Sequence, residues 1–165
     1  MRRFLLLAVA MMAVAGVATG YSVGQISTAP EAKAKVLFVC PHGIRSLMAA
    51  SYFNQEAAKL GLPYRAISRG VAPDSTTVPQ PIVEGLRADG IDVSGFHPAA
   101  VKATDAAASQ RVVTISATLS TEVQKAGGPG IEQWNDVPRP SEGFAMARDS
   151  IKAHVHELIE KLDKH

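Results

Sequence analysis

Residues 36–46, VLFVCPHGIRS, constrain the fold of this chain more than any other segment. Four apolar residues lead into Cys40, which is the only cysteine among the 165 residues, and Pro, His and Gly follow it. A short apolar run that is rich in valine and bounded by Pro and Gly predicts a buried strand. Residues 45–60 predict a helix with an apolar stripe. The segment therefore predicts a strand, a tight loop and a helix, with Cys40 between strand and helix.

This position suggests a chemical role for Cys40. Backbone N–H groups converge at a helix N-terminus and the helix dipole is positive there, which favours the thiolate form of a cysteine. Arg45 lies five residues further on and carries a planar guanidinium that suits a tetrahedral oxyanion. The alternative is that Cys40 is a small buried core residue. Gly43, Arg45 and Ser46 at loop spacing favour a thiolate nucleophile.

The rest of the chain alternates between predicted strands and helices. Strands are predicted at residues 36–40, 64–68, 111–115 and 131–134, and helices at 45–60, 79–88, 117–126 and from Ser141, as the cap, to about 162. This order predicts an α/β single domain with a central four-stranded parallel sheet and helices on both faces. Ligands bind such sheets at the carboxyl ends of the strands, where Cys40 is predicted to lie.

The first 34 residues differ from the predicted domain at 35–165. Arg2 and Arg3 precede an apolar run, and small residues follow at 18–20. This pattern predicts a signal peptide over residues 1–20, followed by a linker at 21–34 and an exported, periplasmic domain. The alternative is an uncleaved N-terminal membrane anchor. A single cysteine cannot form an internal disulfide, so in an oxidising compartment it suggests a working or a buried thiol.

Charge and histidine placement exclude some partners. Two of the 17 Lys and Arg lie in the predicted leader, and the remaining 15 balance the 15 Asp and Glu. Without a basic cluster, no nucleic-acid partner is expected. His97 precedes a proline and is expected to be structural. His154 and His156 lie two apart on a predicted helix, so they face different ways and no metal site is expected. No cofactor is expected, and the oligomeric state is left open.

The ordered motifs resemble the low-molecular-weight protein tyrosine phosphatase superfamily, which includes one class of arsenate reductases. The resemblance extends from about residue 35 to 162. Its motifs after the cysteine loop are Ser68-Arg69-Gly70 for a Ser-Ala-Gly turn, Gly90 to Ser94 for "GIDLS", residues 112–115 for the third core strand, 134–140 for the acid loop and 148–151 for the final helix. The resemblance implies the same α/β fold and a phosphate-like oxyanion or phosphorylated substrate as partner.

The resemblance also implies roles for the loop residues. Cys40 would be the nucleophile and Arg45 would bind the oxyanion. Ser46 would donate a hydrogen bond to the thiolate, although a helix cap is an equal alternative. His42, Gly43 and Ile44 would line the anion site. The implied chemistry is attack on phosphorus, a phosphocysteine intermediate and its hydrolysis.

The loop and the acid position depart from the family pattern. Four residues separate Cys40 from Arg45, where the family has five, and Pro41 has no N–H to offer. The acid loop reads WNDVPRP, so Arg139 stands where the family has an aspartic acid.

Three residues are candidates for the missing functions. Asp136 could be the acid if the loop shifts, or it is a turn aspartate. Arg139 could bind an anionic ligand. His42 could donate to an anion or shuttle a proton, or it is a solvated loop residue.

These residues predict a phosphatase acting on phosphotyrosine or a small phosphomonoester. An oxyanion reductase such as arsenate reductase is an alternative, but without resolving cysteines it would need an external small thiol. Sulfur transfer is another, because Cys-x-x-Gly-x-Arg-Ser also resembles the rhodanese loop. The last alternative is an inactive module that binds an anion or a partner.

Overall fold

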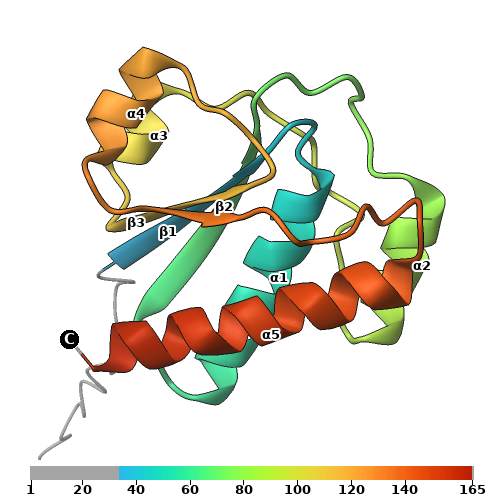
Figure 1. Cartoon of the computed structure of the whole chain (residues 1–165). Coiled ribbons are helices and arrows are strands. Elements are labelled where there is room, and N and C mark those ends of the chain that lie inside the picture. The colour runs from blue at the N-terminus through green and yellow to red at the C-terminus, as the bar shows by residue number, and fades with distance from the viewer. Residues whose placement is uncertain (1–33, 165) are drawn as a thin grey trace, which may run out of the picture.

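Four parallel strands form the centre of the computed structural model, which describes residues 34–164 (Figure 1). They are β1 (Ala34–Cys40), β2 (Tyr64–Gly70), β3 (Arg111–Ile115) and β4 (Ile131–Trp134), in the order β2-β1-β3-β4. Because β1 is central and carries apolar residues on both faces, it is buried on both sides, as its valine-rich run predicts. The predicted α/β fold is confirmed.

Helices cover both faces of the sheet (Figure 1). On one face lie α1 (Ile44–Lys59), α2 (Gln80–Ala88) and α5 (Phe144–Asp163), and on the other lie α3 (Ala103–Ala107) and α4 (Thr121–Gly127). Alternate residues of β1 serve the two layers. Val36 and Phe38 face α1 and α5, whereas Leu37 packs in the cluster of α3 and α4.

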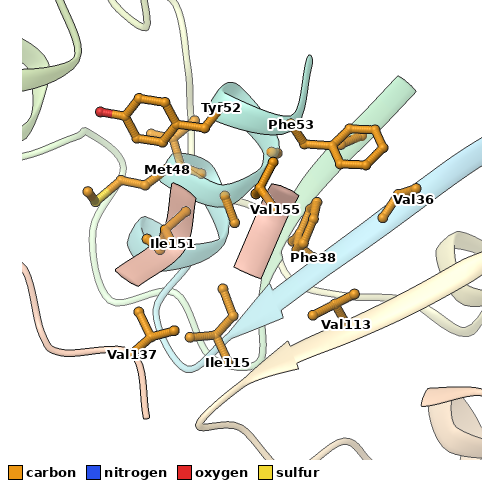
Figure 2. Close-up of a cluster of buried hydrophobic side chains, with 14 of the residues drawn as sticks. Val36, Phe38, Met48, Tyr52, Phe53, Val113, Ile115, Val137, Ile151 and Val155 are labelled. Carbon is orange, nitrogen blue, oxygen red and sulfur yellow. The ribbon is translucent and has the colours of Figure 1, made fainter. Parts of the chain in front are cut away.

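Aromatic side chains fill the larger layer. The ring of Phe38 lies 6.0 Å from that of Phe53 on α1 and 5.3 Å from that of Trp134 on β4, between ring centroids. Figure 2 shows that Ile151 and Val155 of α5 belong to the same buried cluster as Phe38 and Phe53. These contacts hold α1 against the sheet, so the start of α1 is fixed beside the end of β1.

Parallel pairing aligns the carboxyl ends of the strands at one edge. Cys40 pairs in register with Gly70, and Val39 with Thr114. Ser116 follows the end of β3, and its N–H bonds to the carbonyl of Trp134 at the end of β4, 3.1 Å away. This edge is where the cysteine loop lies.

Two helix starts differ from the sequence prediction, and one further helix was not predicted. Ser141 does not cap the last helix: turns bring the chain from Arg139 to Gly143, and α5 begins only at Phe144. The fourth helix begins at Thr121 rather than at 117, because Ser120 caps it by accepting the N–H of Val123 at 3.3 Å. Helix α3 was not predicted, since five residues are too few to show a helical period.

The predicted signal peptide and all of the linker except its last residue lie outside the described residues. That last residue, Ala34, begins β1. Between residues 34 and 164, no helix has the length and apolar character needed to cross a membrane. The same residues contain no group of three His, Cys, Asp or Glu side chains placed to hold a metal ion.

Phe38→Ala is expected to lower the free energy of unfolding by about 3–5 kcal/mol, because it leaves a cavity between two aromatic rings in the core. Urea unfolding followed by fluorescence of the single tryptophan, Trp134, measures this. The matched control is Met146→Ala, whose side chain is 56% exposed and should change stability by less than about 0.5 kcal/mol. Equal losses in the two variants would contradict the assigned core.

A candidate active site at the end of strand β1

The loop between β1 and α1 turns backbone donors toward the Cys40 sulfur. The N–H of Gly43 lies 3.1 Å from Sγ and the N–H of Ser46 lies 3.4 Å from it. Both donors belong to the first turn of α1 or to its cap, where N–H groups have no partner within the helix. Hydrogen bonds to sulfur and the positive end of the helix dipole stabilise a thiolate over a thiol. The geometry thus suits a cysteine nucleophile.

Gly43 is needed for this arrangement. Its φ of 94° lies in the left-handed region, where residues with a side chain are strained. This conformation reverses the chain between the strand and the helix and aims the Gly43 N–H at the sulfur. Pro41, in the same loop, has no N–H to offer the sulfur.

The hydroxyl of Ser46 contacts the same sulfur and is fully buried. Its Oγ lies 3.3 Å from Sγ of Cys40 and 2.8 Å from the carbonyl oxygen of Arg69, and Ser68 Oγ donates to it at 2.9 Å. Ser46 has one hydrogen and two acceptors for it. With a thiol at position 40, the hydrogen stays on Arg69 and S–H donates to Ser46. With a thiolate, the hydrogen can turn to the sulfur, as the predicted role requires.

Gly70 allows the cysteine loop to lie against the end of β2. The pairing of β1 with β2 continues beyond the strands: Val71 N–H bonds to the carbonyl of Cys40 and Ala72 N–H to that of Pro41, each at 2.9 Å. A Cβ on Gly70 would lie 3.0 Å from the nitrogen of Gly43 and 2.9 Å from Pro73 Cγ. Close backbone approach, rather than an unusual φ, therefore requires glycine here.

Arg45 is held by one of its two terminal nitrogens. Nη1 donates to the carbonyl of Val137 at 2.9 Å and to Ser116 Oγ at 3.1 Å. Both Nη1 hydrogens are thereby used, and the Nε and Nη2 hydrogens are left to bind an anion in the two-pronged geometry of a guanidinium. Sequence reasoning missed Ser116, whose φ of 47° is positive although it is not a glycine. Its only signal was its place just after a predicted strand.

Charges around Arg45 act in both directions. Burial, the largest influence, lowers its pKa from the usual value of an arginine, and the Cys40 sulfur opposes this. Arg139 lowers the pKa further by repulsion, and Glu142 raises it. Arg45 still stays protonated, because an arginine ionises far above neutral pH. An anion bound between Arg45 and Arg139 would relieve this repulsion.

A cavity of about 490 Å³ opens onto Cys40 and brings most of the predicted site residues together. Its lining contains the Cys40 thiol, two guanidiniums, one imidazole and a largely apolar wall. The residues are Cys40, Pro41, His42, Ile44, Arg45, Pro79, Pro81, Ile82, Arg139, Pro140 and Ser141. No carboxylate is among them. A larger cavity of about 660 Å³, between β3, β4 and α4, contains no cysteine and touches this site only through Ser116.

Asp136 does not line the cavity. Its Oδ1 lies 2.9 Å from Nε2 of His154 on α5, and the His154 ring stacks on Trp134 with 4.8 Å between centroids. The structure therefore turns this candidate acid toward α5. His154, which the sequence analysis left without a role, is its partner.

Ser46→Ala should slow alkylation of Cys40 by iodoacetamide at neutral pH several-fold, because the thiolate loses a hydrogen-bond donor. The rate is followed by intact mass in the folded protein. Ser94→Ala, an exposed serine in a loop, is the control and should react at the wild-type rate. In the structure Gly43, not Ser46, is the N-cap of α1, so an unchanged rate in Ser46→Ala would show that the Ser46 hydroxyl does not stabilise the thiolate.

Gly70→Ala should slow the same alkylation and lower the free energy of unfolding by about 1–3 kcal/mol, because the added methyl group displaces the backbone at Gly43. Gly95→Ala is the matched control, since a Cβ there meets nothing within 4 Å. Thermal unfolding and alkylation rates measure the two effects. If Gly70→Ala behaves like Gly95→Ala, the loop does not depend on this close approach.

The sequence and the fold of this chain are similar to those of known proteins. Residues 35–165 match the family described as low molecular weight phosphotyrosine protein phosphatase. No curated protein matches the chain.

Among solved structures, YfkJ from Bacillus subtilis is 26% identical with a TM-score of 0.69, over 79% of this chain and 95% of that one. A low molecular weight protein tyrosine phosphatase from T. tengcongensis is 25% identical with a TM-score of 0.69, over 78% and 99%. An arsenate reductase in the phosphate binding state is 25% identical with a TM-score of 0.63, over 78% and 98%. With the family matched over nearly all of the described residues and a cysteine held at the end of β1, this chain belongs to the low molecular weight phosphotyrosine protein phosphatase family.

Proposed function

We propose that this protein hydrolyses phosphate monoesters with an apolar, aryl-like leaving group, such as phosphotyrosine. The observation that carries the proposal is the cavity whose lining combines the Cys40 sulfur and the Arg45 guanidinium with apolar side chains. A phosphate group needs the cationic end of this cavity, and the wall suits a ring.

The Cys40 thiolate attacks phosphorus, and the Nε and Nη2 hydrogens of Arg45 stabilise the charge on the transferring phosphoryl oxygens. Ser46 holds the sulfur as an anion by donating its hydrogen, and the backbone N–H groups of Gly43 and Ser46 do the same. Water then hydrolyses the phosphocysteine and releases phosphate.

The apolar wall supports the choice of leaving group. Ile44 and Ile82 contribute side chains from α1 and α2, and Pro79, Pro81 and Pro140 stiffen the surrounding segments. Proline fixes φ, so this wall loses little freedom when a ligand binds. An aryl ring buried against it would leave the phosphate at the sulfur.

The similar proteins support phosphate as the bound group. One is a protein tyrosine phosphatase, and another is an arsenate reductase in the phosphate binding state. The second similarity favours oxyanion reduction as an alternative function. Because Cys40 is the only cysteine of the sequence, that reaction would need a thiol from outside the chain to regenerate it.

We also propose that the protein is exported. The basic start and apolar run of residues 1–20 support this. Export would place Cys40 in an oxidising compartment, where burial of its side chain to 2% exposure limits access by oxidants.

Purified protein should release p-nitrophenol from p-nitrophenyl phosphate, and Cys40→Ser should abolish this. Arg45→Lys should lower kcat by about 10²-fold or more, because a lysine cannot reproduce the two-pronged contact to the transferring oxygens. Arg65→Lys, on the exposed side of β2, is the control and should keep the wild-type rate.

Release that persists in Cys40→Ser would contradict the proposal. If the wild type does not hydrolyse the ester but reduces arsenate with an added thiol, the function is oxyanion reduction. Sulfur transfer from thiosulfate to cyanide would instead identify a rhodanese-like activity.

A further inference from the structure

The cavity contains a nucleophile and cations but no carboxylic acid. Its titratable side chains are Cys40, His42, Arg45 and Arg139. Guanidiniums do not give up protons near neutral pH, and the cysteine is engaged as the nucleophile. The imidazole of His42 is therefore the one group in this lining that can both donate and accept a proton in that range.

A carboxylate orients this imidazole. Nδ1 of His42 lies 3.2 Å from Oδ2 of Asp74, which follows β2. This contact is an ion pair when the imidazole is protonated, and Nε2 is the ring nitrogen that does not face the carboxylate. His42 lines the cavity and its side chain is 59% exposed, so its ring is open to solvent, whereas Asp74, 69% exposed, lies outside the lining.

The backbone fixes the pair relative to the sulfur. His42 directly follows Pro41, whose carbonyl accepts the N–H of Ala72 at 2.9 Å, and Asp74 lies two residues after Ala72. The carbonyl of Cys40 accepts the N–H of Val71 at the same distance. The two segments that carry His42 and Asp74 are thus joined by hydrogen bonds to each other and to the nucleophile.

We propose that His42 is the general acid and base of this site and that Asp74 positions it. This inference rests on the proposed function. The acid loop provides no proton donor in the cavity, because Arg139 stands in place of the family's aspartic acid and Asp136 is turned to α5. The proposal therefore assigns proton transfer to the cysteine loop.

The proton moves twice in one turnover. In the first step the Cys40 thiolate forms the S–P bond, the P–O bond of the ester breaks, and the leaving oxygen takes both that electron pair and the proton of His42 Nε2. In the second step neutral Nε2 takes a proton from water as the water oxygen bonds to phosphorus. The S–P electron pair then returns to sulfur, and phosphate leaves. Ester and water become alcohol and phosphate, with the enzyme unchanged.

This assignment predicts how the rate depends on the leaving group. p-Nitrophenol leaves readily as an anion, whereas phenol needs a proton as it leaves. The kcat/KM for phenyl phosphate should therefore depend on the proton of His42. The kcat/KM for p-nitrophenyl phosphate should depend on it less.

The test compares kcat/KM for these two substrates in His42→Asn, Asp74→Asn and wild type. His42→Asn should lower kcat/KM for phenyl phosphate by about 10²-fold or more, since a general acid contributes on that scale, and should lower it less for p-nitrophenyl phosphate. Asp74→Asn should give an intermediate loss with the same leaving-group dependence. Asp149→Asn, which breaks an exposed ion pair with Arg148 on α5, is the matched control and should change neither substrate.

Other outcomes would overturn the proposal. Equal losses on both substrates in His42→Asn would assign it a structural role. A leaving-group-dependent loss in Asp136→Asn, with none in His42→Asn, would give the acid to Asp136. Turnover that depends on Cys40 but not on His42 removes this role and leaves the proposed function standing, whereas a wild type without Cys40-dependent turnover removes both. NMR of the His42 ring provides a check that needs no turnover: Asp74→Asn should change the chemical shifts of the ring, and unchanged shifts would refute the pairing.

Discussion

The hydrogen bonds from backbone N–H groups to the Cys40 sulfur are the interaction on which the rest of the site depends. They exist only because the chain reverses at Gly43 and enters α1 at once, so that the first unpaired donors of the helix meet the last side chain of β1. The contacts that hold α1 against the sheet therefore also keep these N–H groups beside the Cys40 sulfur. The aromatic cluster around Phe38 contributes to reactivity in this indirect way.

The close approach of the β2 end to the cysteine loop has a second consequence. Because Gly70 has no side chain, the loop can lie against the segment after β2, and the ladder between the strands extends past Cys40. That extension brings Asp74 to His42, while Arg69, within β2 itself, accepts the hydrogen bond of Ser46 with its carbonyl. The absence of a side chain at Gly70 therefore matters for the position of Ser46 beside the sulfur and for the contact between His42 and Asp74.

The cavity combines cations with an apolar wall, and this combination determines what it suits. Two guanidiniums with no carboxylate in the lining favour an anion, while Ile44, Ile82 and the prolines favour an apolar group beside it. A shorter loop than the family pattern leaves fewer backbone donors for a phosphate. Arg139 adds a second positive charge to the lining, beside that of Arg45.

The sequence by itself determined the fold class, the four strands and the place of Cys40, because these follow from local apolar runs, helix periods and ordered motifs along the chain. It also identified His42, Ile44, Arg45 and Arg139, which the structure brings into one cavity. Only the tertiary structure decided which side chains meet. Ser116 reaches Arg45 across 71 positions, Asp74 reaches His42 from another strand end, and Asp136 pairs with His154 instead of entering the cavity. Such contacts depend on strand order, loop direction and burial, which residues far apart in the chain set together and no local pattern encodes.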